Sequence, residues 1–299
     1  MSTSLLAQLR AEFHAGLLGS ALTKSEAGIW SNADSSSKQS KNIAEGIVSQ
    51  IKKEVASSVK RAGQTLGNDF EIAVNRFLQT SFSKLGHLRP GKWLFLPEVQ
   101  QMEKALEQGS EKIGLSIADF EQFAHLNTLD DIAKRNPEVA LALGNSYIIR
   151  PDIIVARWPE EDAAINKRVS VVDADMARKT AIRKRNNSRP ILHASISCKW
   201  TLRSDRAQNA RTEALNLIRN RKGRVPHIVV VTAEPLPSRL ASLALGTGDV
   251  DCVYHFALKE LQTAVSNLSQ ENEGKQMLQN LTEGLRLKDI TDLPLDLAI

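Results

Sequence analysis

Two carboxylates and one lysine stand beside regular segments of the chain, where side chains distant in sequence can meet. Asp152 precedes the apolar run 153–156, and Lys199 follows the apolar run 191–196. Glu213 lies in a segment of helical periodicity that begins just after the lysine. Carboxylates can hold a divalent cation, and a lysine beside them can stabilise a negatively charged phosphate. Convergence of the three predicts metal-dependent hydrolysis of a phosphodiester, although Asp152 or Lys199 alone would also suit a solvated strand terminus.

A charged cluster stands at the start of the helix expected after the lysine, which begins at Ser204 or Asp205 and runs to about Lys222. The cluster consists of Arg203, Asp205 and Arg206. Arginines at a helix N-terminus oppose the helix dipole, so they are not placed there for helix stability. Arginine can bond to guanine O6 and N7, and a carboxylate can accept from cytosine N4. The cluster therefore suits the reading of G·C pairs, and the alternative is a mutually paired surface cluster.

Periodicity and turn residues place the elements that must position these side chains. Strands are expected at residues 93–96, 147–155, 191–199, 227–232 and 251–256, and the segment 147–155 is either one bent strand or two strands with a corner at Pro151. Helices are expected within 1–30 and at 42–60, 69–85, 99–108, 115–145, 204–222, 238–245 and 258–268, and a further one is suggested near 174–184. Loops or turns are expected at 31–42 and 63–68.

The alternation of strands and helices after residue 147 predicts an α/β fold. Its central sheet would be mixed, helices would flank both faces, and extra helices would precede it. The chain has 299 residues, of which 42% are hydrophobic, enough for a substantial core. No strong linker divides it, so residues 1–299 are expected to form a single domain.

The charge is modest and uneven. The net charge is +5, which is compatible with a polyanionic partner without requiring one. Basic residues concentrate in two runs, 178–189 and 219–224. Each run could be a solvated loop, or could line the phosphates of a nucleic acid beside a nuclease site.

Several classes of protein are disfavoured. The two cysteines, Cys198 and Cys252, lie in apolar runs, which predicts reduced core thiols and a cytoplasmic setting. The sequence contains no Cys-x-x-Cys or His-x-x-x-His pair, so a zinc site is not expected. We expect no signal peptide, no membrane span and no dinucleotide fingerprint, because Gly246-x-Gly248 lacks the third glycine.

Four short motifs between residues 193 and 258 carry a resemblance to a known family. They are Ser-Cys-Lys-Trp-Thr, Arg-Ser-Asp-Arg-Ala-Gln-Asn-Ala-Arg, Arg-Asn-Arg-Lys-Gly-Arg and Ala-Leu-Gly-Thr-Gly. In these motifs the chain resembles the NgoMIV-type restriction endonucleases, a group of the PD-(D/E)xK nuclease superfamily. The likeness extends to residues 63–68, 142–144, 150–155 and 287–290, so it covers most of the chain. It is least evident in residues 92–118, 157–190 and 262–284.

The resemblance implies a restriction-endonuclease-like core and a cytoplasmic bacterial type II enzyme. Such enzymes cut double-stranded DNA at G/CCGGC and leave four-base 5′ overhangs. They act as homotetramers that bind two GCCGGC sites, and a cognate DNA methyltransferase is the expected genetic partner. Mg²⁺ is the implied cofactor, with two ions in each active site. One departure from the general superfamily pattern is Ser197, two residues before the lysine, where an acid is usual; Glu213 would supply the missing carboxylate.

Catalytic roles follow from the resemblance by position. Asp152 and the backbone carbonyl of Cys198 would be metal ligands, and Lys199 would orient water or stabilise the phosphate. Glu213 and Glu71 would hold water molecules around the metal. For Glu71 the alternative is a first-turn acid that complements the dipole of the helix expected at 69–85.

DNA-reading roles are implied in the same way. Arg203, Asp205 and Arg206 would read the central CCGG in the major groove. Arg239 would read the outer G·C pair, and Gln64 would touch the minor groove.

Two other functions remain open from the residues alone. A nuclease of DNA repair or junction resolution would cut by structure and would not need the Arg-Ser-Asp-Arg cluster. A catalytically inactive DNA-binding protein would gain nothing from carboxylates clustered beside a phosphate. Incubation with plasmid DNA and Mg²⁺, followed by sequencing of the cut ends, separates the three.

Overall fold

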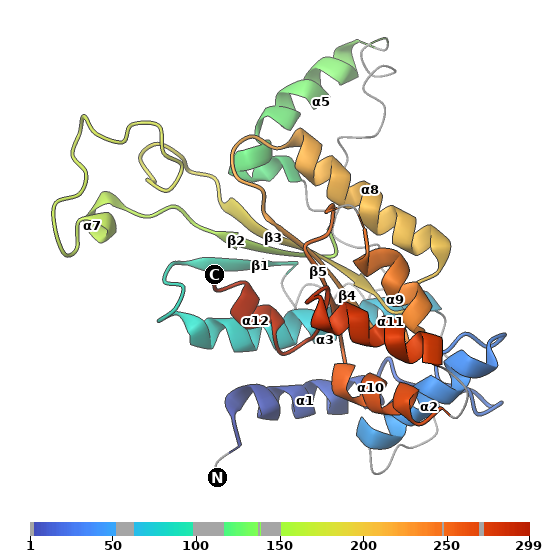
Figure 1. Ribbon diagram of the computed structural model, residues 1–299. Helices are drawn as coiled ribbons and strands as arrows, with labels where there is room; N and C mark the ends of the chain where they lie inside the picture. Colours follow the sequence, from blue (N-terminus) through green and yellow to red (C-terminus); the bar gives the residue numbers. More distant parts are fainter. Residues whose placement is uncertain are drawn as a thin grey trace. The chain divides into compact units, whose positions relative to one another are not determined.

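The protein is described by a computed structural model that covers residues 3–51, 63–97, 117–136, 138, 151–246, 248–268 and 272–299 (Figure 1). The chain divides into two compact units. Unit 1 comprises Met1–Leu88, Ile196–Arg211 and Ile228–Ile299, and unit 2 comprises Arg89–Ser195 and Thr212–His227.

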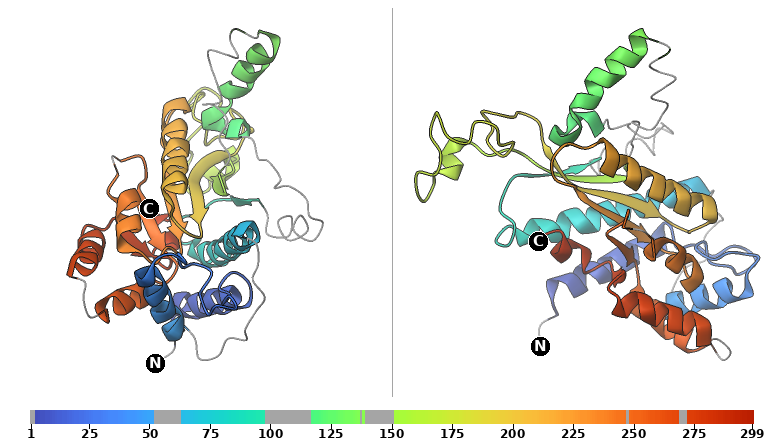
Figure 2. Two further views of the ribbon diagram at one scale, coloured as in Figure 1. Left: turned by 90° about the vertical axis from the view of Figure 1, so that its right-hand side faces the viewer. Right: turned by 45° about the horizontal axis from the view of Figure 1, so that its top comes forward.

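Unit 2 contains an antiparallel strand pair. β1 (Trp93–Leu96) pairs with β2 (Ile153–Arg157), with Trp93 opposite Arg157 and Leu96 opposite Ile154. The first four residues of β2 are fully buried, as the apolar run predicts. The unit also holds η2 (Ile117–Asp119), η3 (Glu121–Phe123), α5 (His125–Arg135) and α7 (Asp162–Ile165). Figure 2 shows α7 within the long yellow-green connection that follows β2.

Unit 1 contains parallel strands and most of the helices. β4 (His227–Thr232) pairs in parallel with β5 (Cys252–His255), and β5 pairs in parallel with β6 (Leu287–Asp289). Continuous apolar runs such as 228–231 suit parallel strands buried on both faces. The helices are α1 (Leu5–Gly19), α2 (Lys38–Ile51), α3 (Gly63–Phe82), η1 (Ser83–Leu85), α9 (Pro237–Ala244), α10 (Leu258–Ser266), α11 (Asn272–Glu283) and α12 (Leu293–Asp296).

Three elements run from one unit into the other. One is β4, which has only its first residue, His227, in unit 2. β3 (Ile191–Lys199) contributes 191–195 to unit 2 and 196–199 to unit 1, and α8 (Ser204–Asn220) is divided after Arg211. The strands follow the order β1-β2-β3-β4-β5-β6 in one sheet. With an antiparallel pair at one end and parallel strands at the other, the sheet is mixed. The predicted α/β fold with flanking helices is confirmed.

Most predicted elements that fall in described residues are present, but three predictions were wrong. The turn expected at 63–68 is the start of α3. Leu66 and Phe70 are both buried four residues apart, so the buried face of the helix extends back through this segment. No described atom lies near a Cβ built at Gly67, and one glycine in a helix costs only about 1 kcal/mol. α2 also begins earlier than expected, at Lys38.

The third error concerns residues 174–184, which form turns instead of a helix. The side chain of Arg183 is buried there and organises the loop. Its Nη2 lies 2.6 Å from Asp162 Oδ2 and donates to the carbonyl of Asp173 at 2.7 Å. Partners supplied by other loop residues outweigh the local tendency toward a helix.

Some expected elements lie partly or wholly outside the described residues. They are the helices at 99–108 and 115–145, the end of the helix at 42–60 and the beginning of the strand at 147–155. Within 117–136 the structure has two short 3₁₀ turns and α5. In the part of the chain that is described, no helix combines the length and apolar character needed to cross a membrane.

Candidate active site

The end of β3 is fixed through its backbone in unit 1. Thr232, at the end of β4, donates its hydroxyl hydrogen to the carbonyl oxygen of Lys199 at 2.7 Å. The backbone N–H of Ala233 points to the same oxygen at 3.4 Å. Cys198 is buried and Lys199 is half-buried, as expected for alternating sides of a strand. The backbone that carries both residues is therefore held by the end of β4.

Helix α3 brings Glu71 to the same part of unit 1. Phe70 meets Trp200 edge to face, with ring centroids 5.1 Å apart. These rings belong to the immediate chain neighbours of Glu71 and Lys199, so α3 packs against the chain just after β3. The Glu71 side chain is buried. Because α3 begins at Gly63, Glu71 lies beyond the first turn, and the alternative of a dipole-complementing acid is wrong.

Asp152 and Glu213 belong to unit 2. Asp152 immediately precedes β2, as predicted from its place before the apolar run, and it is half-buried. Glu213 lies on α8 next to the buried Ala214 and is also half-buried. Each residue thus has its predicted place on its own element. The convergence of these carboxylates with Lys199 stays a prediction.

The donor set fits Mg²⁺ by its chemistry. Asp152 offers carboxylate oxygens and the chain at Cys198 offers a carbonyl oxygen, and Mg²⁺ prefers a few oxygen ligands together with water. The buried Cys198 thiol is not required by this assignment. Among the described residues, no group of three or more His, Cys, Asp or Glu side chains is arranged to hold a metal ion. A carboxylate, a carbonyl and water would have to share the coordination.

The charged cluster at the start of α8 is in unit 1. Arg203 and Asp205 are exposed and Arg206 is half-buried. Arg206 Nη1 donates to the Thr201 hydroxyl at 2.8 Å, which orients its guanidinium. Within the described residues, the three side chains form no ion pair with one another. The alternative of a mutually paired surface cluster is therefore not favoured.

Arg239 lies on α9 between two carboxylates of unit 1. Its guanidinium pairs with Asp34 through Nη2, and its Nη1 lies 3.6 Å from Glu234 Oε2. Hydrogen bonds from Ser36 and from Arg239 hold the pKa of Asp34 well below its usual range. Burial raises the pKa of Glu234, against the lowering effect of hydrogen bonds from the backbone of Leu202 and Leu236 and of the charge on Arg239.

The sequence reasoning did not single out Asp34, Thr232 or Glu234. The signal available for Glu234 was its place: an acid within Thr-Ala-Glu-Pro, directly after a continuous apolar strand. Carboxyl ends of parallel strands are where open α/β sheets build sites. Gln64 lies in the first turn of α3, and its side chain is outside the described part of the structure.

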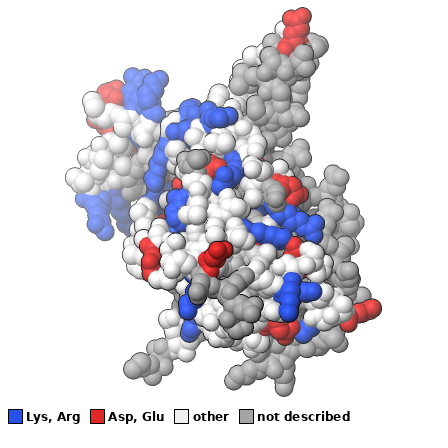
Figure 3. All heavy atoms as spheres, turned by 45° about the vertical axis from the view of Figure 1, so that its right-hand side comes forward, with Lys and Arg blue, Asp and Glu red and all other residues white. Residues whose placement is uncertain are grey.

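The two basic runs are partly engaged in ion pairs within unit 2. Arg183 and Lys184 pair with Asp162 and Glu161, and Lys222 pairs with Glu121 at 2.8 Å. In the same unit, Arg189 donates to the Ala118 carbonyl. Figure 3 shows Lys and Arg in several separate groups with Asp and Glu between them. The runs are therefore not uninterrupted cationic surfaces.

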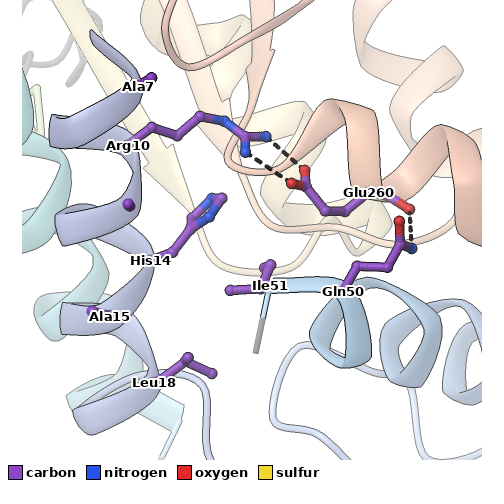
Figure 4. A pocket seen from close by; sticks show the side chains of 9 residues that line it. Ala7, Arg10, His14, Ala15, Leu18, Gln50, Ile51 and Glu260 are labelled. Carbon is purple, nitrogen blue, oxygen red and sulfur yellow. Dashed lines mark hydrogen bonds and ion pairs between the residues drawn. The ribbon is translucent and has the colours of Figure 1, made fainter. Parts of the chain in front are cut away.

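A cavity of about 300 Å³ lies between α1, α2 and α10 of unit 1, and the described residues that line it include none of those predicted to be catalytic (Figure 4). Its polar lining is already partnered. Arg10 bonds both oxygens of Glu260, and Gln50 donates to the Glu260 carbonyl at 3.0 Å. His14 bonds the Phe256 carbonyl at 2.8 Å, and burial lowers its pKa.

Comparison with known proteins gives the family. A sequence model of the NgoMIV restriction enzyme family matches residues 13–299. The type II restriction enzyme NgoMIV of Neisseria gonorrhoeae is 50% identical over 296 residues, which are 99% of this chain and 99% of that enzyme. The restriction endonuclease PspGI, solved with its substrate DNA, aligns with 98% of this chain and 91% of its own, but at 13% identity and a TM-score of 0.25. That last similarity is too low to carry an argument.

The family match favours a site-specific endonuclease over the two alternatives left open by the residues, a structure-directed repair nuclease and an inactive DNA-binding protein. It extends through both units and includes the carboxylates, the lysine and the arginine cluster described above. The chain belongs to the NgoMIV family of type II restriction enzymes.

Proposed function

We propose that the protein is an Mg²⁺-dependent endonuclease that cuts both strands of DNA at G/CCGGC and leaves four-base 5′ overhangs. The observation that carries the proposal is the succession of Lys199 at the end of β3 and the Arg203–Arg206 cluster at the start of α8. The proposal assigns catalysis to the lysine and base reading to the cluster, and their closeness along the chain supports it. The 50% identity to NgoMIV supports the same specificity.

In this proposal the chain's own residues have three roles. Asp152 and the Cys198 carbonyl hold Mg²⁺, two ions in each site. Lys199 orients the attacking water or donates to the phosphate as its negative charge grows. Glu213 and Glu71 accept hydrogen bonds from water and so fix its position. When bound, the metal supplies charge stabilisation for the entering and leaving oxygens.

Base reading is assigned to five side chains. Arg203, Asp205 and Arg206 read the central CCGG from the major groove, where arginine matches guanine and a carboxylate matches cytosine. Arg239 reads the outer G·C pair, and its place between Asp34 and Glu234 would aim its guanidinium. Gln64 contacts the minor groove.

The proposal extends to the assembly and its setting. The two units act as one endonuclease domain, which the continuous family match over residues 13–299 supports. Four copies form a homotetramer that engages two GCCGGC sites. The enzyme works in the bacterial cytoplasm, beside a DNA methyltransferase of the same specificity that protects the host.

The test uses plasmids that carry GCCGGC, a plasmid with one base pair of each site changed, and Mg²⁺ or EDTA. Sequencing of the ends should show cuts after the first G only on the first plasmid and only with Mg²⁺. Cuts at another sequence, or cleavage in EDTA, would overturn the specificity or the cofactor, respectively.

A further inference from the structure

We propose that Glu234 is a positioning residue that couples the Lys199 end of β3 to both base-reading elements, the start of α8 and helix α9. The proposal rests on the proposed function, because it takes Lys199 as catalytic and the arginines as base readers. Glu234 touches neither DNA nor metal in this role. It acts by fixing the backbone from which the acting side chains project.

One fully buried carboxylate bridges the two reading elements. Glu234 Oε2 accepts from the backbone N–H of Leu202 at 2.7 Å, and Oε1 accepts from that of Leu236 at 3.1 Å. Leu202 directly precedes Arg203, and Leu236 directly precedes α9, the helix of Arg239. The two oxygens of one side chain therefore set the start of both elements relative to each other, within unit 1.

The same residue is linked to the catalytic strand through Thr232. The Thr232 hydroxyl donates to the Lys199 carbonyl at 2.7 Å and accepts from the Glu234 N–H at 3.2 Å. A shift of the Glu234 backbone would thus be transmitted to the end of β3. The hydrogen bonds connect Lys199, Thr232, Glu234 and Leu202 in sequence.

The N-terminal segment closes the network. The side chain of Asn32, which is fully buried, donates to the Ala233 carbonyl at 3.0 Å. Two residues later, Asp34 pairs with Arg239, whose other nitrogen lies 3.6 Å from Glu234. The guanidinium is held from two sides, so loss of one carboxylate would leave it free to pivot about the other.

An acid at position 234 is better explained by the groups that it orients than by the space that it fills. A buried carboxylate is costly unless its oxygens are bonded, and an apolar residue would fill the space at lower cost. Two backbone N–H groups donate to Glu234 and the Arg239 guanidinium forms an ion pair with it, a set of partners that an ionised carboxylate suits best. Glutamine keeps the shape but turns one acceptor into a donor, so one of these bonds must break.

The experiment compares Glu234→Gln with Glu260→Gln. The control removes a carboxylate of unit 1 that lines the cavity described above and has no proposed role in reading DNA. Steady-state kcat and KM are measured with oligonucleotides that contain GCCGGC or the same site with its outer pair exchanged, and thermal unfolding is followed in parallel. We expect Glu234→Gln to lose at least tenfold in kcat/KM on GCCGGC. We also expect at least a fivefold loss of discrimination between the two sites, whereas Glu260→Gln keeps wild-type discrimination even where it lowers the unfolding temperature.

If the folded Glu234→Gln variant discriminated between the two sites as the wild type does, the inference would be overturned. Glu234 would then only stabilise the local backbone. If that variant does not fold, Thr232→Val tests the same network from the other side. It should lower kcat more than KM, and an unchanged kcat would also overturn the coupling. Failure of the wild-type enzyme to cut GCCGGC would count against the proposed function instead, and the comparison could be repeated on the sequence it does cut.

Discussion

At the scale of single residues, several residues that are proposed to act on DNA are held in place by neighbouring residues. Lys199 has its backbone oxygen fixed by Thr232, and Arg206 is oriented by Thr201. Arg239 is held by Asp34 and Glu234. For Lys199 it is the backbone that is held, and for Arg206 and Arg239 it is the guanidinium. Preorganisation of this kind lowers the cost of binding and of reaching the transition state.

Arg206→Ala should lose specific binding by more than tenfold, because a bidentate contact to guanine contributes about 1–3 kcal/mol of discrimination. Binding to DNA without the site should change little. Fluorescence anisotropy with GCCGGC and scrambled duplexes, in Ca²⁺ to prevent cleavage, measures both. Arg219→Ala, in the last turn of the same helix, is the control. Equal loss of affinity for both duplexes in Arg206→Ala would reduce its role to a phosphate contact.

His255 gives a prediction for stability against pH. Its side chain is fully buried, and burial lowers its pKa from 6.5 to about 4. Above pH 6.5 the folded and unfolded states are both neutral here, so the residue has no pH-dependent effect. Between about pH 6.5 and 4 only the unfolded state binds the proton, so the free energy of unfolding should fall as the pH falls, by about 3 kcal/mol in all.

Urea unfolding at pH 7, 6, 5 and 4.5 tests this, with His255→Gln beside the wild type. The variant cannot bind the proton and should show a shallower loss of stability over this range. An identical pH dependence in both proteins would assign the acid sensitivity to other groups.

At the scale of elements, five of the six strands found in the described residues were predicted, because each of the five is a short apolar run bounded by polar or turn residues. The sixth, β6 (Leu287–Asp289), has one apolar residue and was not singled out as a strand. The runs that became β1, β2, β4 and β5 fall where expected. The errors came from effects that are not local. Leu66 is buried with Phe70, which extends α3 past Gly67, and Arg183 finds partners in a loop. Helix α11 was not predicted, because its sequence is largely polar.

In the candidate site, too, local features could be predicted and non-local contacts could not. Its residues and elements could be predicted, because motif and periodicity are properties of the sequence. The supporting contacts could not, since Asn32, Asp34 and Glu234 come together only in the folded chain. Glu71 illustrates both: its type was noticed, but its burial and its distance from the helix start emerge only from the structure.

Two helical glycines should respond in opposite ways to alanine. At Gly67 in α3 no described atom lies near an added Cβ, so Gly67→Ala should stabilise by up to about 1 kcal/mol through helix propensity. At Gly46 in α2 the added Cβ would lie 2.8 Å from the Ala264 Cβ of α10, so Gly46→Ala should destabilise by about 1–3 kcal/mol. Chemical denaturation measures both, and a shift of the same sign would show that these helices are packed differently.

At the scale of the whole molecule, the family match spans nearly the full chain, whereas the contacts that support the site lie within one unit or the other. The proposed tetramer binds two sites at once, and tethering two sites on one DNA raises the effective concentration of the second. A plasmid with two GCCGGC sites should therefore be cut faster per site than a plasmid with one.

A short duplex that contains the site, added in trans, should accelerate cleavage of the one-site plasmid. A duplex with a scrambled site is the control. Equal rates per site on both plasmids, together with a monomeric or dimeric mass by light scattering, would contradict the proposed assembly.

The central claim is that Asp152 and Lys199 act together on the scissile phosphodiester. Asp152→Ala is the most direct measurement, with cleavage of GCCGGC DNA in Mg²⁺ and binding of the same duplex recorded on one preparation. Loss of several kcal/mol of charge stabilisation should slow cleavage by at least roughly a thousandfold while specific binding is retained. Cleavage at the wild-type rate by a folded Asp152→Ala protein would contradict the account.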